Sequence, residues 1–359
     1  MRTLRRAREL ASAGLIPPGR RAAAEAVARR FEVAVSPAIA GLIEYADDPI
    51  GRQFLPRAEE LVTAPEERSD PIGDLRFSPV KGIVHRYPDR VLLKPLLVCP
   101  VYCRFCFRRE QVGRDGALRA RELAAALDYI GSHENIWEVI LTGGDPLLLS
   151  PRRLKDIVRA LDRMPHVRVI RIHTRLPVVD PVLLTPARVA ALVAKKALWV
   201  VLHANHPREL TDEVRAACAR LNRAGIPLLS QSVLLKGVND DEQVLEKLFR
   251  DLVAMRVKPY YLHHPDLARG TAHFRVGLAR GQALMRGLRG RVSGLCQPGY
   301  VLDLPGGFGK VPVGPAYARA RPDGSWEIAD PDGVVHRYPP ATAGKDFAAS
   351  VEESAISKP

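Results

Sequence analysis

Three of the five cysteines in this 359-residue chain fall within eight residues. Cys99, Cys103 and Cys106 form a C-x3-C-x2-C pattern, and thiolates at this spacing are typical ligands of a metal or an iron–sulfur cluster in a reducing compartment. A cubane cluster normally takes four cysteines, so three would leave one iron open to a ligand that is not protein. A structural zinc site would need a fourth Cys or His nearby, and the first to follow is His133. The pattern therefore predicts a [4Fe–4S] cluster with an open iron.

A glycine pair beside a carboxylate forms a second candidate site, at Gly143, Gly144 and Asp145. A Gly-Gly turn exposes backbone N–H and carbonyl groups at close range, and the neighbouring carboxylate can accept from an ammonium group. This tripeptide is also a common turn, so its meaning depends on where the fold places it.

A third candidate is Lys310, which ends the glycine-rich run 306–309. A phosphate-binding P-loop would have Ser or Thr after the lysine and then a helix, whereas Val311 and Pro312 follow here. A lysine presented by a glycine loop can form a Schiff base with an aldehyde cofactor such as pyridoxal phosphate (PLP). The alternative is a surface lysine after a flexible loop.

Short apolar runs alternate with longer helical patterns from residue 91 onwards. The strands are expected at Val91–Cys99, Ile136–Thr142, Val167–His173, Leu198–His203, Leu228–Leu234 and Val257–His263. The helices are expected at Arg119–Ser132, Pro151–Arg163, Pro186–Lys196, Asp212–Ala224 and Asp240–Met255. Such alternation indicates parallel βαβ units with both sheet faces covered. Six units predict an α/β fold with a partial (β/α)6 barrel, and a doubly wound open sheet is the alternative.

Polar residues follow every one of the six expected strands. They are the cysteine cluster and residues 143–146, 173–175, 203–206, 231–239 and 263–266. In parallel barrels the active site forms at the carboxyl ends of the strands. These polar segments are therefore expected to converge on one pocket.

The barrel is expected to occupy the middle of the chain, over residues 76–290. Residues 1–75 show no alternating strand pattern and are expected to form an N-terminal helical region. Residues 291–345 are expected to form a C-terminal segment that carries Lys310. Its two hairpin signals are Asp323-Gly324 and Asp332-Gly333. The polar last residues, 346–359, are expected to be a disordered tail.

The chain carries a formal charge of +14, with arginines spread through every segment. No dense Lys/Arg run is interleaved with aromatic residues, so a solvated surface is favoured over a nucleic-acid partner. The apolar runs are too short to span a bilayer, and the Arg-rich start lacks the apolar core of a secretory signal. We expect a cytoplasmic protein with no membrane partner.

Together these motifs resemble the lysine 2,3-aminomutase family over most of the chain, from about Ile83 to Tyr317. The cysteine spacing just after a first barrel strand is that of the radical S-adenosylmethionine (SAM) superfamily, in which SAM chelates the open iron. The resemblance implies a radical SAM barrel with a [4Fe–4S] cluster, SAM and PLP. It also implies an isomerase that moves the amino group of L-lysine from C2 to C3, giving β-lysine.

The resemblance assigns cofactor roles to single residues. Those it places at the cluster and SAM are Cys99, Cys103, Cys106, Gly143, Gly144, Asp145, His203 and Gln231. Those it places at PLP are Tyr87, Arg90 and Lys310. Arg90 matches the position that binds the phosphate, and Lys310 matches the lysine that forms the Schiff base.

Three further residues match the positions that hold the substrate. Arg108 takes the place of the residue that pairs with the substrate carboxylate, and Asp266 and Asp303 match the two carboxylates that hold the lysine side-chain ammonium. The alternative is that Asp266 pairs with a neighbouring cation such as Arg269 while Asp303 stabilises the glycine loop.

The chain departs from the family pattern at a zinc site. Enzymes of the family bind zinc between subunits with a Cys after a Val-Asn-Asp stretch and a Cys cluster near the C-terminus. Here Asp241 stands at the first of these positions and no Cys lies beyond Cys296. We therefore expect no zinc.

The pathway and some partners stay open at this point. Residues 262–274 resemble the branch that makes β-lysine for modifying elongation factor P, so that pathway and another amino acid substrate are alternatives. A radical SAM enzyme that modifies RNA and a cluster-binding module without catalysis are the alternatives from other classes. Besides L-lysine, the expected partners are an electron donor such as flavodoxin or ferredoxin and further copies of the chain.

Overall fold

The computed structural model describes residues 2–339, so the expected tail at 346–359 lies outside the described residues. The α-helices are α1 (Ala7–Ser12), α2 (Arg21–Arg30), α3 (Pro37–Leu42), α4 (Pro49–Phe54), α5 (Ala120–Gly131), α6 (Pro151–Asp162), α7 (Leu176–Val179), α8 (Pro186–Ala191), α9 (Asp212–Arg223), α10 (Glu242–Ala254) and α11 (Leu278–Leu288). The strands are β1 (Ile83–Tyr87), β2 (Arg90–Leu96), β3 (Glu138–Gly143), β4 (Val169–Thr174), β5 (Ala197–His203), β6 (Leu228–Val233), β7 (Val257–His263), β8 (Gly299–Leu304), β9 (Gly309–Pro312), β10 (Ala318–Ala320), β11 (Trp326–Ala329) and β12 (Val335–Tyr338).

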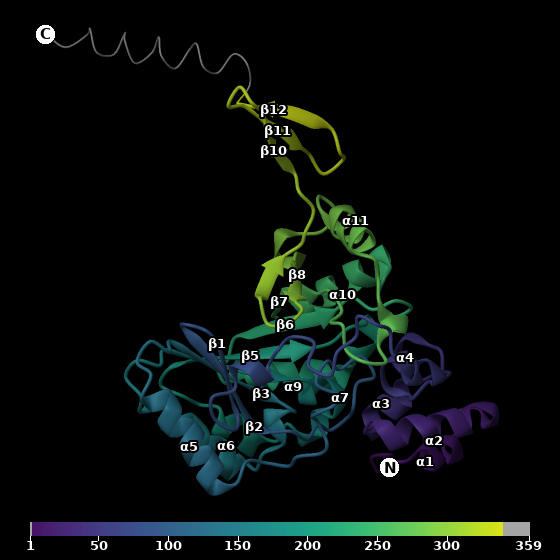
Figure 1. Ribbon diagram of the computed structural model, residues 1–359, viewed down its shortest axis with the longest axis vertical. Coiled ribbons are helices and arrows are strands. Elements are labelled where there is room, and N and C mark those ends of the chain that lie inside the picture. The colour runs from purple at the N-terminus through teal and green to yellow at the C-terminus, as the bar shows by residue number, and fades with distance from the viewer. Residues whose placement is uncertain (1, 340–359) are drawn as a thin grey trace, which may run out of the picture.

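Strands β1 to β9 form one curved sheet whose strand order is the order of the chain (Figure 1). Strands β2 to β8 run parallel, β1 lies antiparallel on β2, and β9 lies antiparallel on β8. A doubly wound sheet reverses its strand order at a switch point, so that alternative is excluded. The sheet keeps two edges, β1 and β9. The predicted partial barrel is therefore confirmed.

The six predicted strands are β2 to β7, and each begins and ends within three residues of its expected bounds. A seventh parallel strand, β8, was not predicted. It pairs with β7 and continues through a glycine turn into β9, so the glycine-rich segment is the turn of a hairpin at the edge of the barrel. This hairpin places Lys310 on a strand.

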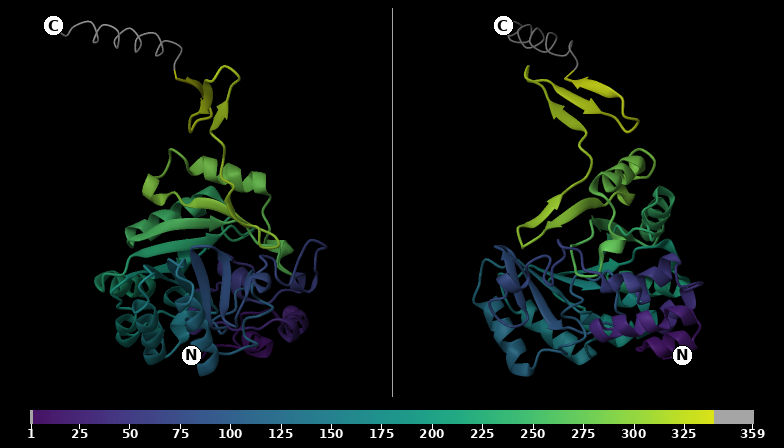
Figure 2. Two further views of the ribbon diagram at one scale, coloured as in Figure 1. Left: turned by 60° about the vertical axis from the view of Figure 1, so that its left-hand side comes forward. Right: turned by 45° about the vertical axis from the view of Figure 1, so that its right-hand side comes forward.

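The helices that connect the parallel strands lie on the outer face of the curved sheet, as right-handed crossovers require (Figures 1 and 2). Along β4, Ile170 and Ile172 are fully buried, while Arg171 and His173 alternate with them and are only partly buried. The alternation shows that one row of side chains packs under the helices and the other points into the barrel.

One predicted helix is shorter than expected. The pattern predicted a helix to Lys196, but α8 ends at Ala191. The backbone N–H groups of Lys195 and Lys196 donate to the carboxylate of Asp162, at 3.0 and 3.2 Å. These bonds hold the segment against the end of α6 and turn it into β5.

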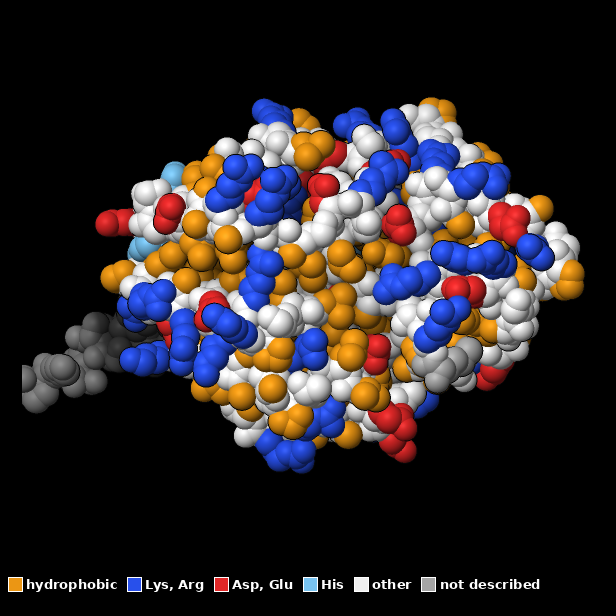
Figure 3. All heavy atoms as spheres, turned by 90° about the horizontal axis from the view of Figure 1, so that it is seen from below, with side chains coloured by type: hydrophobic (Ala, Val, Ile, Leu, Met, Phe, Trp, Pro, Cys, Tyr) orange, Lys and Arg blue, Asp and Glu red, His pale blue; other side chains and the backbone are white. Residues whose placement is uncertain are grey.

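The first and last elements of residues 2–339 lie on opposite sides of the barrel (Figure 1). The helices α1 to α4 form the N-terminal part and pack on the barrel, and β10 to β12 form a small antiparallel sheet beyond α11 (Figure 2). The turns of this small sheet contain Gly324 and Gly333 with positive φ, so the two predicted hairpins are confirmed. No helix within residues 2–339 is long and apolar enough to cross a membrane. Figure 3 shows Lys and Arg side chains spread over one face of the molecule among apolar and uncharged groups.

Candidate functional site

The carboxyl ends of the parallel strands bring several predicted site residues to the inside of the barrel. Cross-strand register places His203 beside Gln231 and Asp303 beside Lys310. Three histidines on β4, β5 and β7 bury an Nε2 atom that has no hydrogen-bond partner in the described chain: His173, His203 and His263. The sequence placed all three in polar segments expected at the pocket, but it assigned a cofactor role only to His203. Because a buried polar atom without a partner is costly, the three nitrogens mark space that fits a polar ligand.

Lys310 lies at the centre of a small network inside the barrel. Its backbone N–H donates to the hydroxyl of Tyr87 at 2.8 Å, which fixes the hairpin against β1. Its Nζ donates to the carboxylate of Asp303 and lies 3.2 Å from Nδ1 of His263. Burial alone would raise the pKa of Asp303, but the hydrogen bond from His263 and the charge of Lys310 lower it to about 2. The amine of Lys310 therefore donates to a carboxylate that is ionised at neutral pH.

Asp266 follows β7 and differs from Asp303 in having no cation of its own. It makes no ion pair within residues 2–339, and Arg269, the alternative partner, lies 4.0 Å from Glu110 instead. Burial raises the pKa of Asp266 to about 7, and the charge of Asp303 adds to this effect. A partly buried carboxyl group without an ion-pair partner fits a ligand that brings a positive charge.

Arg108 is buried and already has an anionic partner. Its Nη2 lies 2.8 Å from Oδ2 of Asp74, which precedes β1 and is also reached by Arg86 at 3.4 Å. The spacing of residues in the sequence gave no sign of Asp74, because it stands 34 residues before Arg108. The ion pair fixes the guanidinium at the rim of the barrel, where a substrate carboxylate could share it.

Tyr87 and Arg90 lie on the β1–β2 hairpin beside the Lys310 strand. The guanidinium carbon of Arg90 lies 3.8 Å from the ring centroid of Tyr87, and Nη1 pairs with Asp89 at 2.7 Å. Because Tyr87 also bonds the backbone of Lys310, a cation, a phenol and an amine are close together here. This set of donors fits a phosphorylated aldehyde.

The three clustered cysteines follow β2 and line one cavity, together with Phe31 and Tyr102 among others. Burial raises the pKa of the Cys99 thiol, and it raises that of Cys106 to about 11. Within the described residues no three His, Cys, Asp or Glu side chains converge on a point where one metal ion could bind. Three thiols that line one cavity fit the ligand set of a cluster whose fourth iron takes a ligand that is not protein. The other two cysteines of the chain are buried in the core.

The glycine pair brings the end of β3 against the cysteine loop. A Cβ atom at Gly144 would lie 2.4 Å from the carbonyl oxygen of Val98, and Gly143 has a φ of 106°. The Asp145 carboxylate accepts from the hydroxyl of Thr174 at 2.7 Å and from the backbone N–H of Arg175 at 2.8 Å. These hydrogen bonds connect the end of β3 to the end of β4. The role at SAM predicted for Asp145 did not include these donors from the protein itself.

A buried glutamate that was not predicted holds the cysteine loop from the N-terminal side. Glu60 is fully buried and pairs with Arg104 at 2.6 Å and with Arg109. Arg104 also donates to the carbonyl oxygen of Glu32 at 2.7 Å. No motif in the sequence could reveal this network, because its members are far apart along the chain.

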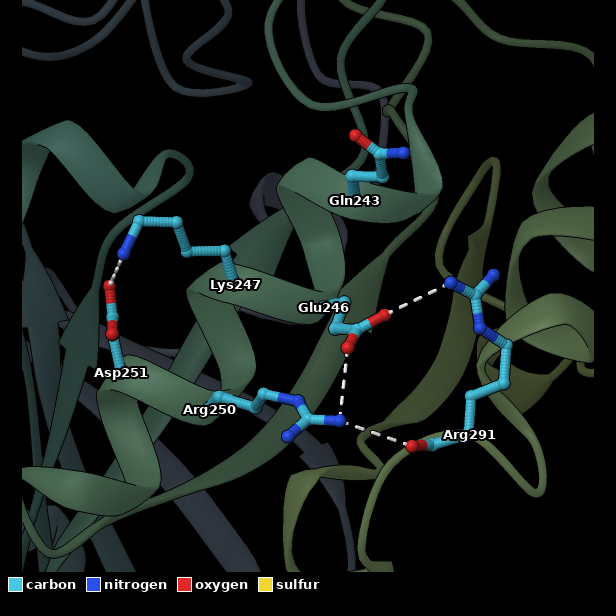
Figure 4. A pocket seen from close by; sticks show the side chains of 6 residues that line it. All are labelled: Gln243, Glu246, Lys247, Arg250, Asp251 and Arg291. Atoms are coloured by element: carbon cyan, nitrogen blue, oxygen red, sulfur yellow. Dashed lines mark hydrogen bonds and ion pairs between the residues drawn. The ribbon is translucent and has the colours of Figure 1, made fainter.

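A hollow on the surface lies along α10 (Figure 4). Its charged side chains pair with each other, as Lys247 does with Asp251 at 2.9 Å and Arg250 with Glu246 at 3.0 Å. Since these charges are exposed and compensated, the hollow is a solvated helix face.

Two family models match the chain. Residues 93–248 match the Radical SAM superfamily, and residues 285–355 match the model described as Lysine-2,3-aminomutase. The L-lysine 2,3-aminomutase of Acetoanaerobium sticklandii is 43% identical over 311 residues, 86% of this chain and 75% of that protein. The L-lysine 2,3-aminomutase of Clostridium subterminale is 41% identical, over 86% of this chain and 75% of that protein. The Glutamate 2,3-aminomutase of Clostridioides difficile is 37% identical, over 81% of this chain and 69% of that protein.

Proposed function

Since the chain belongs to the lysine 2,3-aminomutase family of radical SAM enzymes, we propose that it moves the amino group of L-lysine from C2 to C3 to give β-lysine. The single observation that carries the choice of lysine is Asp266, a partly buried carboxyl group that makes no ion pair within residues 2–339 and has the carboxylate of Asp303 nearby. The ε-ammonium group of lysine supplies that charge. A glutamate side chain would add a negative charge to the same spot.

The residues of the barrel fit the cofactors of the family, which are a [4Fe–4S] cluster, SAM and PLP. Cys99, Cys103 and Cys106 would hold the cluster, and the unpartnered histidine nitrogens face the space that SAM and PLP would share. When bound, the cluster and SAM supply a hydrogen-abstracting radical, and PLP supplies the group on which nitrogen migrates.

The protein side chains bind and orient the substrate at both ends. Arg108, held by Asp74, takes the α-carboxylate, while Asp266 and Asp303 take the ε-ammonium. Lys310 would hold the aldehyde group of PLP through Nζ, and when that amine is free Asp303 and His263 lie close enough to bind it. The buried walls of the barrel exclude water from this space, which strengthens each charge interaction.

The proposal is tested by anaerobic incubation of the reconstituted protein with L-lysine, SAM and dithionite, followed by separation of α- and β-amino acids. We expect β-lysine with L-lysine and no β-glutamate when L-glutamate replaces it. Turnover of glutamate at a comparable rate would overturn the choice of substrate. In the cell the cluster needs one electron from a donor such as flavodoxin or ferredoxin, and the protein functions as a homo-oligomer in this proposal.

A further inference from the structure

We propose that Arg175 is a positioning residue for the cluster ligand Cys103, and that its guanidinium makes the bound cluster easier to reduce. The inference rests on the proposed function, in which Cys103 holds one iron. Arg175 directly follows β4 and stands 72 residues from Cys103 in the sequence. The sequence placed it in a polar segment, residues 173–175, that was expected at the pocket, but assigned it no role at the cluster.

The contact is a direct one between a buried arginine and a partly buried cysteine. Nη1 of Arg175 lies 2.8 Å from Sγ of Cys103, and the arginine side chain is 7% exposed. Among the cluster cysteines, Cys103 alone receives a side-chain donor within residues 2–339. A hydrogen bond from a charged donor to a sulfur ligand is stronger than one from a neutral group.

The guanidinium is held in place without any help from the cluster. Its Nη2 donates to Oε1 of Gln53 and to Oε2 of Glu209, both at 2.7 Å. The guanidinium carbon lies 4.6 Å from the ring centroid of Phe54 and 5.5 Å from that of Phe105. Because the planar fork is fixed by its acceptors and its stacking, its Nη1 is held toward Cys103, while Nε has no partner in the described chain.

The partners of Arg175 are fixed in turn by the backbone. Oε1 of Glu209 accepts from the backbone N–H groups of Asn205 and His206, at 3.0 and 2.9 Å, and from Nε2 of Gln53 at 3.0 Å. Glu209 has no exposed surface. The network therefore joins α4, the segment after β4 and the segment after β5 to the cysteine loop. These hydrogen bonds hold the guanidinium of Arg175 next to Cys103.

Such a contact acts on the electron affinity of the cluster. One electron enters the cluster on reduction and adds negative charge to the irons and their sulfur ligands, so a donor aimed at a ligand sulfur stabilises the reduced state. The charge of Glu209 offsets that of Arg175 at longer range. The local effect that remains is the N–H···S hydrogen bond at Cys103.

The test is a redox titration of the cluster in the double variant Arg175→Met/Glu209→Gln. Removing both charges leaves neither one alone in the interior and keeps the net charge of the protein. At the potential where half of the wild-type cluster is reduced, we expect the ratio of reduced to oxidised cluster to fall at least tenfold. For one electron this equals a shift of 59 mV to lower potential. The signal is the electron paramagnetic resonance of the reduced cluster, titrated with dithionite and mediators without SAM or lysine.

Two single variants complete the design. Arg188→Met is the matched control, because Arg188 donates to the carbonyl oxygens of Leu147 and Leu183 at 2.8 Å and reaches no sulfur, so its midpoint potential should equal that of the wild type. Arg175→Lys keeps the charge but loses the fork, and it should also shift the midpoint to lower potential. If the double variant fails to hold iron, the midpoint potential of Arg175→Lys alone tests the proposal.

The possible failures are distinguishable. A wild-type protein without a [4Fe–4S] cluster, or a Cys103→Ala variant with a full one, would refute the proposed function before Arg175 is varied. If the wild type holds the cluster and the midpoint potential in Arg175→Lys equals that of the wild type, only the inference on Arg175 is overturned.

Discussion

Asp266 makes no ion pair within residues 2–339, and lysine binding at this carboxyl group should depend on pH near neutrality. It must be ionised to pair with an ammonium group, and burial raises its pKa to about 7. Below pH 7 the protonated form dominates, so we expect KM for lysine to rise about tenfold per pH unit as the pH falls. Steady-state kinetics at saturating SAM between pH 6 and 8.5 would measure this. Asp266→Asn should have a higher KM that no longer changes over this range, and a flat wild-type profile would contradict the prediction.

Asp303 serves Lys310 as well as the substrate, so its substitution should have two effects. The pair of Asp303 with Lys310 is partly buried, and the substrate ammonium loses the same carboxylate, so we expect Asp303→Asn to lower kcat/KM for lysine about 100-fold. Because Lys310 also loses its carboxylate, the pH dependence of PLP loading, followed by absorbance, should change too. Asp266→Asn is the matched comparison, since Asp266 makes no contact with Lys310 and should load PLP like the wild type. Equal loading curves for all three proteins would show that Asp303 does not serve Lys310.

At the scale of residues, spacing predicted which groups carry chemistry but not which groups hold them. The cysteine pattern and the glycine loop are local, so they could be read directly from the chain. Asp74, Glu60 and Glu209 act through ion pairs across 34 or more residues. Such pairing depends on the fold and leaves no periodic signal.

The turn after β3 shows how an element depends on one glycine. A Cβ at position 144 would overlap the backbone of Val98, which cannot move without the cysteine loop. We expect Gly144→Ala to lower the free energy of unfolding by about 1–3 kcal/mol and to weaken SAM binding. Gly131→Ala at the end of α5 is the control, because its nearest neighbour would be Met164 at 3.9 Å. Urea unfolding compares the two variants, and equal losses would contradict the role given to the turn.

The start of α10 bears on the predicted absence of zinc. Asp241, which stands where the family has a cysteine, caps this helix by accepting from the backbone N–H groups of Gln243 and Val244 at 2.9 and 3.1 Å. A helix cap takes the place of a metal ligand at this position. We predict less than 0.1 zinc per chain after purification, measured by elemental analysis with iron as the internal reference. One tightly bound zinc per chain would refute the prediction.

At the scale of elements, apolar periodicity predicted six strands because each is flanked by helices of regular length. The seventh strand, β8, was not predicted, because a proline and two glycines follow it directly and such residues are typical of a loop. Its pairing with β9 is formed only once the barrel edge exists. The position of Asp303 opposite Lys310 could therefore not be predicted from the sequence.

The described molecule consists of a barrel, an N-terminal helical part and a small C-terminal sheet. The division into regions at residues 75 and 290 stays a prediction, although β1 and β8 both join the sheet of the barrel from near those limits. The small sheet β10 to β12 has strands that are largely exposed on both faces, and a sheet of this size is marginal by itself. The N-terminal part, in contrast, reaches into the site through buried side chains.

Glu60 tests whether the N-terminal part is needed to form the cluster site. Its carboxylate pairs with Arg104 and Arg109 in the cysteine loop, and all three side chains are buried. Although burial alone would raise the pKa of Glu60, the two arginines lower it, so the stabilisation is present at neutral pH and is lost as the pH falls into the acid range. We expect Glu60→Gln to cost about 3–5 kcal/mol and to reduce the iron content after reconstitution.

Glu59 provides the matched control for this prediction. Its carboxylate is half exposed and lies 3.4 Å from Arg57, and an exposed pair contributes at most about 1 kcal/mol. Glu59→Gln should therefore keep the iron content and unfolding curve of the wild type. If Glu60→Gln also kept both, the N-terminal helices would be a separate cover. If only Glu60→Gln lost iron, the cysteine loop depends on a charge from outside the barrel, and neither part forms the site alone.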